Sequence, residues 1–221
     1  MPSVRKSYDE ELLQLDTLLA RMGHEAGAAI ESALTALRND DIELARSVVA
    51  RDSQIDAGEH EIEHRCLQLL LRQQPVAGDL RMVSTALKVV TDMERIGDHA
   101  SDIAELILRI HGEHDFHSVR HLPEMAEEAV AMVHDAIQAF VAQDEKAAQE
   151  IIKRDDRVDE LFNRVKNEVI ELLKQTGDIS DQSIDFLMIA KYVERIGDHA
   201  VNICEWTEFG KTGKIKDVRI L

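Results

Sequence analysis

Carboxylates at four-residue spacing are the side chains of this sequence best suited to chemistry. Projected on a helix at about 100° per residue, they fall on apolar seams, the lines of residues that pack into a core. Val48 and Leu67 flank the acids of one seam, and Leu87 and Leu108 lie along another. The four pairs are Asp52 and Asp56, Glu94 and Asp98, Asp155 and Asp159, and Glu194 and Asp198.

Acids on an apolar seam need a partner, because burying several carboxylates together costs several kcal/mol per ion unless they are paired, protonated or bound to a cation. Arg95 and Arg195 project to the side of the seams, which leaves Lys191 as the clearest nearby neutralising group. Oxygen-rich sites suit Mg, Ca, Mn or Fe. We therefore interpret the pairs as metal sites; the alternatives are a solvated groove or arginines from a partner helix.

The elements that position these acids are long helices. From Tyr8 to Ala33, apolar residues recur in alternating steps of four and three, and the same pattern runs from Val119 to Phe140. Two further helical patterns cover about residues 40–74 and 76–111, separated by Pro75. The segment 38–41 offers Asn and Asp as helix N-caps. Because no segment alternates apolar and polar residues over a useful length, the sequence predicts an all-α protein.

The chain also contains an internal repeat. Residues 94–100, Glu-Arg-Ile-Gly-Asp-His-Ala, recur without change at 194–200. At an offset of 103, Arg51, Asp52 and Asp56 match Arg154, Asp155 and Asp159. This predicts two tandem, similar three-helix bundles, six long helices in all, with domains at 1–113 and 114–221 joined through 111–117. Gly97 and Gly197 border the acids, where a missing side chain allows close approach of helices or a ligand.

Charge and composition exclude several classes of protein. The 221 residues carry 26 Lys and Arg against 43 Asp and Glu, a net charge of −17. This balance argues against binding to nucleic acid and against attachment to anionic lipid. The sequence shows neither a secretory signal nor an apolar run long enough to cross a membrane, and its two cysteines cannot form a disulfide framework. We expect a cytoplasmic protein.

Other motifs carry less weight. His60 to His64 fit H-E-x-x-H, but both histidines project off the seam and the second repeat has no counterpart. Glu61 and His64 form a single E-x-x-H, whereas di-iron bundles need two. We interpret the histidines at 111, 114, 117 and 121 as a polar turn between the bundles, and the basic segment 211–219 as a frayed end. Because neither a nucleophile constellation nor a phosphate-binding loop is found, we expect no enzyme.

Residues 73–81, Gln-Gln-Pro-Val-Ala-Gly-Asp-Leu-Arg, and residues 93–100, Met-Glu-Arg-Ile-Gly-Asp-His-Ala, resemble the PhoU family of bacterial phosphate-signalling regulators. With the doubled E-R-I-G-D and D-x-x-x-D, the resemblance covers nearly the whole chain and implies two three-helix bundles. It also implies multinuclear clusters of Fe, Zn, Mn or Mg. One would use Asp52, Asp56, Glu94 and Asp98, and the other Asp155, Asp159, Glu194 and Asp198.

The two implied sites are not equivalent. Phe162 and Lys166 stand where the first repeat has Glu59 and Glu63, and Asn202 stands where it has Asp102.

The resemblance implies a cytoplasmic adaptor rather than an enzyme. Family members link the ATPase subunit of a phosphate ABC transporter to a membrane sensor histidine kinase, keep the phosphate-starvation response off and restrain uptake. It also implies a homodimer, and contact with the membrane only through partners. Two alternatives stay open. A metal-dependent helical enzyme would lose activity with Glu94 and Asp98, whereas a metal-free acidic scaffold would bind a basic partner whether or not a chelator is present.

Overall fold

The computed structural model describes residues 4–110, 119–176, 181–215 and 218–219. Seven helices and one pair of short strands make up the described part of the chain. The helices are α1 (Val4–Asn39), α2 (Ile42–Gln73), α3 (Gly78–Ile110), α4 (Leu122–Ala142), α5 (Glu145–Ile152), α6 (Asp155–Thr176) and α7 (Asp181–Thr212), and the strands are β1 (Lys214–Ile215) and β2 (Val218–Arg219).

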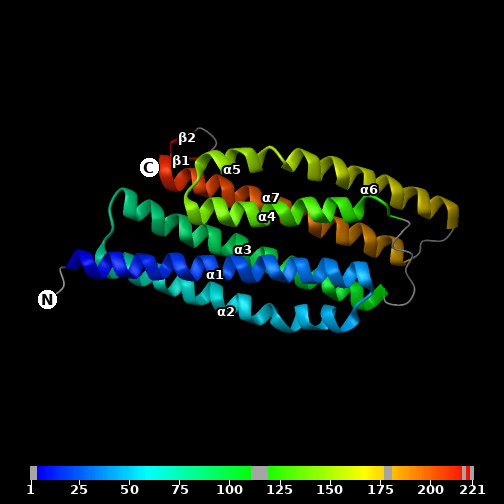
Figure 1. The fold of residues 1–221 in the computed structure, drawn as a ribbon, viewed down its shortest axis with the longest axis horizontal. Helices are drawn as coiled ribbons and strands as arrows, with labels where there is room; N and C mark the ends of the chain where they lie inside the picture. Colours follow the sequence, from blue (N-terminus) through cyan, green and yellow to red (C-terminus); the bar gives the residue numbers. More distant parts are fainter. Residues whose placement is uncertain (1–3, 111–118, 177–180, 216–217, 220–221) are drawn as a thin grey trace.

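The all-α class and the tandem repeat are confirmed. In Figure 1, α1, α2 and α3 form one bundle, and α4, α5, α6 and α7 form the second bundle alongside it. The most extensive contact between the bundles is that of α3 with α7, the two helices that carry the repeated motif. The outer helices α2 and α6 lie on opposite sides of this pair. The predicted boundary between residues 113 and 114 lies outside the described residues and stays a prediction.

Local sequence signals explain where α2 and α5 begin and where α2 ends. As expected for the segment 38–41, Asp41 caps α2 by accepting a hydrogen bond from the Leu44 backbone N–H at 3.0 Å. Asp144 caps α5 in the same way, through the N–H groups of Lys146 and Ala147. Helix α2 ends before Pro75, which disfavours helix in the residue before it.

The middle helix of the second repeat is interrupted, a feature that the sequence did not predict. Where the first repeat has one continuous α2, the second has α5 and α6, separated by a turn at Lys153 and Arg154. The Arg154 guanidinium bonds Glu128 at 2.7 Å and Asp135 at 2.5 Å, both on α4. These contacts hold the turn against the neighbouring helix.

The apolar seams form a core that extends through both bundles. Leu15, Leu19 and Met22 of α1 and Met125 and Met132 of α4 are almost fully buried. Helix α1 also packs closely on α4, since a Cβ atom at Gly23 would lie 2.8 Å from Ile137 Cγ2. Burial of these apolar side chains, with the close contact between α1 and α4, is the main contribution to the stability of the two bundles, which together form a rigid helical platform.

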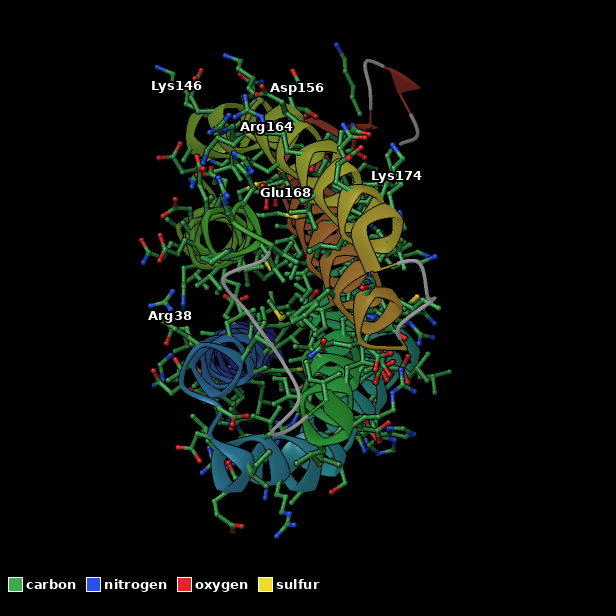
Figure 2. The ribbon with its side chains drawn as sticks, turned by 90° about the vertical axis from the view of Figure 1, so that its right-hand side faces the viewer. Arg38, Lys146, Asp156, Arg164, Glu168 and Lys174 are labelled. Atoms are coloured by element: carbon green, nitrogen blue, oxygen red, sulfur yellow. The ribbon has the colours of Figure 1, made fainter. Side chains whose placement is uncertain are left out.

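Charged side chains project from the outside of this platform. Viewed from one side, Lys146 and Lys174 point away from α5 and α6, and Arg38 lies at the end of α1 (Figure 2). The Arg38 guanidinium bonds Glu127 of α4 at 2.8 Å, an ion pair between the two bundles. None of the described helices combines the length and apolar character that a transmembrane span requires.

The basic C-terminal segment is not a frayed end where it is described. Residues of β1 pair with those of β2 in antiparallel register, Lys214 with Arg219 and Ile215 with Val218. This small pair follows α7 directly.

Candidate metal centre

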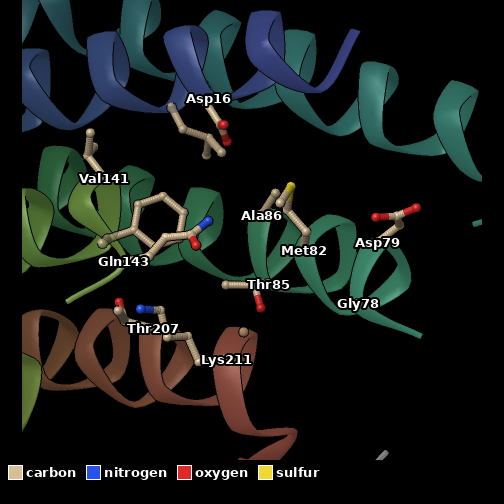
Figure 3. A pocket seen from close by; sticks show the side chains of 13 residues that line it. Asp16, Gly78, Asp79, Met82, Thr85, Ala86, Val141, Gln143, Thr207 and Lys211 are labelled. Carbon is tan, nitrogen blue, oxygen red and sulfur yellow. The ribbon is translucent and has the colours of Figure 1, made fainter. Parts of the chain in front are cut away.

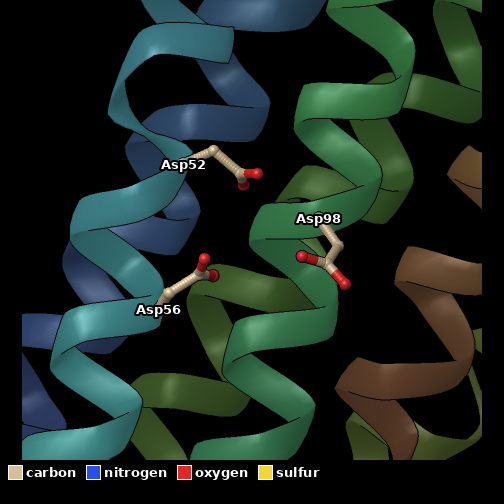
Figure 4. Close-up of side chains that lie close together, drawn as sticks. All are labelled: Asp52, Asp56 and Asp98. Carbon is tan, nitrogen blue, oxygen red and sulfur yellow. The ribbon is translucent and has the colours of Figure 1, made fainter.

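Three predicted ligands of the first repeat come together between α2 and α3. Asp52 and Asp56, one turn apart on α2, point toward Asp98 on α3 (Figure 4). One carboxylate oxygen of each residue lies within 4.8 Å of the other two, and all three side chains are half-buried. The spacing of four residues on α2 sets the first two acids side by side, and the packing of α3 supplies the third.

Glu94 extends this acidic cluster by one turn of α3. Its side chain is only 15% exposed, and its Oε2 atom is buried without a hydrogen-bond partner. Asp52 Oδ1 is likewise buried without a partner. Burial, reinforced by the negative charge of Asp98, raises the pKa of Glu94 from 4.5 to about 7. Burial and the neighbouring Asp56 raise the pKa of Asp52 in the same direction.

Arg95 neutralises part of this charge. The sequence projection placed it to the side of the seam, but its long side chain folds back so that Nη1 lies 2.8 Å from Asp98 Oδ2. Its Nε atom lies 3.5 Å from Glu94 Oε2 without forming a hydrogen bond. Because the arginine side chain is 54% exposed, it covers the outer rim and leaves the buried oxygens unsatisfied.

The first site therefore fits a hard or borderline metal cation. A cation bound among Asp52, Asp56 and Asp98 would offset the mutual repulsion of these acids, and positive charge that also reaches Glu94 would compensate the two carboxylate oxygens that lack hydrogen-bond partners. Aspartate and glutamate oxygens are the ligands that Mg²⁺, Mn²⁺ and Fe ions accept in proteins.

The second site is more open. Its acids lie on α6 (Asp155, Asp159) and α7 (Glu194, Asp198). Burial, with repulsion from Asp159 and Asp198, raises the pKa of Asp155 to about 6. Among the described residues, three ligand atoms within 4.8 Å of one another occur in the first repeat and not in the second. The structure therefore brings three of the four predicted ligands of the first site close together, whereas the described acids of the second site form no such group.

Lys191 lies within the second site. Its ammonium group donates a hydrogen bond to Glu194 Oε2 and stands 5.4 Å from the centre of the Phe162 ring. The carboxylate of Glu194, 15% exposed, thus has a cation from its own helix.

Two histidines between the bundles were not anticipated as a pair. The rings of His99 and His199, the last polar residues of the two motif copies, lie 5.5 Å apart between α3 and α7. His199 Nδ1 is 2.8 Å from Asp92 Oδ1, whereas both ring nitrogens of His99 are buried without a hydrogen-bond partner. Burial lowers the pKa of His99 and favours its neutral form. The sequence offered one signal for this contact, because His99 and His199 occupy the same position in the two copies of the repeated motif.

The other histidine motifs do not form a site in the described part of the chain. His60 and His64 are exposed, and they bond the Asp56 carbonyl and Gln68, each at 2.7 Å. His121 Nδ1 lies 2.7 Å from Glu168 Oε1. Histidines 111, 114 and 117 lie outside the described residues, so the predicted polar turn stays a prediction.

A separate cavity of about 310 Å³ lies where α1, α3, α4 and α7 meet (Figure 3). Apolar side chains such as Met82 and Phe140 line it, together with Asp16, Thr85 and Lys211. Burial raises the pKa of Asp16. Because Asp52, Asp56 and Asp98 do not line this cavity, it is distinct from the acidic cluster.

The PhoU domain model matches residues 19–107 and 122–207, one copy in each bundle. The chain belongs to the PhoU family. All eight predicted metal ligands fall within the two PhoU matches.

Named PhoU relatives align along nearly their full length. A phosphate-specific transport system accessory protein PhoU homolog of Clostridium acetobutylicum is 39% identical over 215 residues, 97% of this chain and 98% of the relative. A homolog of the same description from Zymomonas mobilis is 35% identical, over 95% of this chain and 88% of the relative. These names describe accessory proteins of transport rather than enzymes.

Solved PhoU structures have the same fold. The crystal structure of the phosphate transport system regulatory protein PhoU from Streptococcus pneumoniae has a TM-score of 0.88 and 28% identity, covering 96% of this chain and all of that one. PhoU from Pseudomonas aeruginosa gives a TM-score of 0.89 and 30% identity, over 94% of this chain and 100% of that one.

Proposed function

We propose that this protein is a negative regulator of the phosphate-starvation response and of phosphate uptake, acting as a cytoplasmic adaptor. The observation that carries the proposal is the cluster of Asp52, Asp56 and Asp98. It lies in a PhoU domain, and the chain's relatives are named as phosphate-transport accessory proteins. A rigid helical platform with an acidic cluster, and without an evident nucleophile near that cluster, suits docking better than catalysis.

The metal part of the proposal assigns four acids to each bundle. The first bundle would hold Fe, Zn, Mn or Mg through Asp52, Asp56, Glu94 and Asp98, and the second would do so through Asp155, Asp159, Glu194 and Asp198. When bound, such a cation supplies positive charge that can bridge the acidic surface to an acidic or phosphate-bearing group of a partner. The chain's own residues hold the cation at a fixed place on α2 and α3, and the packed core keeps that place constant.

The partners would be the ATPase subunit of a phosphate ABC transporter and the cytoplasmic part of a sensor histidine kinase. Contact with the membrane would then be indirect, through these partners, which agrees with the absence of a membrane-spanning helix in the described residues. We also propose a homodimer as the working unit. The domain division at 1–113 and 114–221 is part of the same proposal.

Elemental analysis tests the metal sites. Untagged protein supplied with Fe, Mn, Zn and Mg is compared with two double variants, Glu94→Ala with Asp98→Ala and Glu194→Ala with Asp198→Ala. Each variant should lose the metal of its own bundle and keep that of the other. Wild-type protein that binds none of these metals would rule out the clusters.

Partner binding tests the adaptor role and separates it from the alternatives. Purified protein is titrated into the transporter ATPase subunit and into the kinase's cytoplasmic domain, with and without EDTA. Binding that EDTA and the Glu94→Ala/Asp98→Ala variant both weaken supports the metal-dependent adaptor. Binding unaffected by EDTA supports the metal-free scaffold, and metal-dependent turnover of a substrate without partner binding supports an enzyme.

A cellular test addresses regulation directly. In a strain lacking this protein, a reporter of the phosphate-starvation response should stay on in phosphate-rich medium, and the wild-type chain should switch it off. A reporter that is repressed equally well without the protein would contradict the proposed role.

A further inference from the structure

The second acidic site contains a cation that the first site lacks at the same place. Lys191 occupies the position that Thr91 holds in the first repeat, at the offset of 100 that relates α3 to α7. Its ammonium donates to Glu194 Oε2 and also faces the Phe162 ring at 5.4 Å. An ion pair and a cation–π contact together keep this charge beside the acids.

Two further exchanges between the repeats act in the same direction. Phe162 replaces Glu59, so the ring under the ammonium stands where the first site has an acid. Lys166 replaces Glu63, and its ammonium bonds Asn163 Oδ1 at 2.8 Å on the same helix. Compared with the first site, the second has exchanged acids for an aromatic ring and a further cation, and so has less need of an external positive charge.

We propose that Lys191 is a built-in counter-ion that stands in for a metal charge, so that the first site binds metal tightly and the second binds it only when the ammonium is displaced. This inference rests on the proposed metal-binding function and adds an order of loading to it. The two sites would then report different metal concentrations, and the second would be the weaker one.

The arginine of the first site does not play the equivalent part. Arg95 contacts Asp98 from the exposed rim and its Nε lies 3.5 Å from Glu94 Oε2, but Asp52 Oδ1 and Glu94 Oε2 stay buried without hydrogen-bond partners. Lys191, by contrast, bonds Glu194, the residue that matches Glu94 in the repeat. Arg195 matches Arg95 in sequence, but among the described residues the ion pair with the second site's Glu194 comes from Lys191, at the position where the first repeat has Thr91.

A reciprocal exchange tests the inference, with Mn²⁺ alone as the probe. Each site is measured by itself: the first in the Glu194→Ala/Asp198→Ala background, and the second in the Glu94→Ala/Asp98→Ala background. The first site should bind Mn²⁺ at least tenfold more tightly than the second, as expected for one additional unit charge near a half-buried site, where screening is partial (about tenfold). Thr91→Lys should weaken the first site about tenfold, and Lys191→Thr should strengthen the second about tenfold.

Thermal unfolding in EDTA provides a readout that needs no metal. Lys191→Thr removes the only cation that the structure pairs with Glu194 among the described residues, so the melting temperature should fall by about 2 °C. Thr91→Lys adds a cation beside unsatisfied acids and should raise it by about as much. Lys174 is exposed and pairs with Glu171 away from the site, so Lys174→Thr is the matched control. It should change neither the Mn²⁺ affinity of either site nor the shifts in melting temperature caused by the exchanges at positions 91 and 191.

The outcomes separate the inference from the function on which it rests. Equal Mn²⁺ affinities at the two sites, unchanged by the exchange, would overturn the inference and leave the metal-binding function intact. Failure of both sites to bind Mn²⁺, Fe, Zn or Mg would overturn the metal function and the loading order together. In that case opposite shifts of the melting temperature in EDTA would still establish Lys191 as a counter-ion, and unchanged melting temperatures would remove that role as well.

Discussion

Gly97 and Ile55 pack so closely that a side chain at position 97 would require Ile55 to shift. A Cβ atom built on Gly97 would lie 2.8 Å from Ile55 Cδ1 and 3.0 Å from its Cγ2. Gly197, which matches Gly97 in the repeated motif, has more room: its Cβ would lie 3.5 Å from Asp155 Oδ1 and Val158 Cγ1. The same glycine thus sets the distance between α2 and α3 in the first bundle and is much less constrained in the second.

The two glycines should respond differently to the same substitution. Gly97→Ala forces α3 away from α2, so we expect a loss of about 2 kcal/mol of stability and weaker metal binding at the first site, because Asp98 moves away from Asp52. Gly197→Ala should be neutral or stabilising by up to about 1 kcal/mol, since alanine favours the helix. Urea unfolding and Mn²⁺ titration of both variants provide the measurement. Equal effects at the two positions would contradict the packing difference.

The metal-free protein should lose stability as the pH rises. The pKa of Glu94 is raised from 4.5 to about 7 in the folded chain, so between these values the folded state binds more protons than the unfolded one. Raising the pH through this window therefore favours unfolding. In EDTA, the melting temperature should fall between pH 5.5 and pH 8, and Glu94→Gln should reduce that fall by about 2–4 °C. Glu171→Gln, at an exposed ion pair, is the control and should leave the pH profile unchanged.

Metal should reverse this pH dependence. Protons compete with metal for the same carboxylates, so Mn²⁺ affinity at the first site should weaken as the pH falls below about 7, the pKa of Glu94. Saturating Mn²⁺ should therefore stabilise the protein more at pH 8 than at pH 5.5. A thermal shift that is the same at both pH values would indicate that Glu94 is not a ligand.

Neutralising one member of the acidic cluster should have opposite effects with and without metal. Asp98→Asn removes a charge that repels Asp52 and Asp56, so we expect the melting temperature in EDTA to be unchanged or higher. It also removes a ligand, so Mn²⁺ affinity at the first site should drop at least tenfold, by analogy with the loss of a metal-supporting residue (about 10–100-fold). Calorimetric titration and thermal unfolding of one preparation test both effects. A large loss of stability in EDTA would show that the carboxylate has a structural role instead.

An ion pair between an exposed arginine and a buried aspartate joins the end of α3 to the start of α7. Arg109 donates to both oxygens of Asp185, with Nε at 2.9 Å from Oδ2, and the aspartate side chain is only 3% exposed. Arg109→Ala leaves a buried carboxylate without this partner, so we expect a loss of about 2–3 kcal/mol in urea unfolding. Adding Asp185→Asn should recover part of that loss. If the double variant is no more stable than Arg109→Ala, the uncompensated charge is not the cause.

The sequence was informative wherever a property depends on local period or on exact repetition. Seams such as Leu15, Leu19 and Met22 recur with the helical period, and these residues are buried as that period requires. The N-cap at Asp41 was readable because capping depends on a few adjacent residues. The recurrence of residues 94–100 at 194–200 identified the tandem bundles, since a repeated sequence folds into a repeated unit.

Contacts between helices needed the tertiary structure. Sequence spacing placed Asp52 and Asp56 on one face of α2, but their meeting with Asp98, and the looser arrangement of the second set, depend on how closely two helices pack. The fold-back of Arg95 onto Asp98 depends on a flexible side chain, which an axial projection cannot follow.

Equal motifs also became unequal in the folded chain. The two copies of Glu-Arg-Ile-Gly-Asp-His-Ala are identical in sequence, yet His99 is buried without hydrogen-bond partners, whereas His199 bonds Asp92. The sequence by itself determined the all-α class, the tandem repeat and the acids available for a metal site, but not the break between α5 and α6. Tertiary packing decided which acids lie close together and which of them pair with a cation. The reason is that helices far apart in the sequence bring these side chains together.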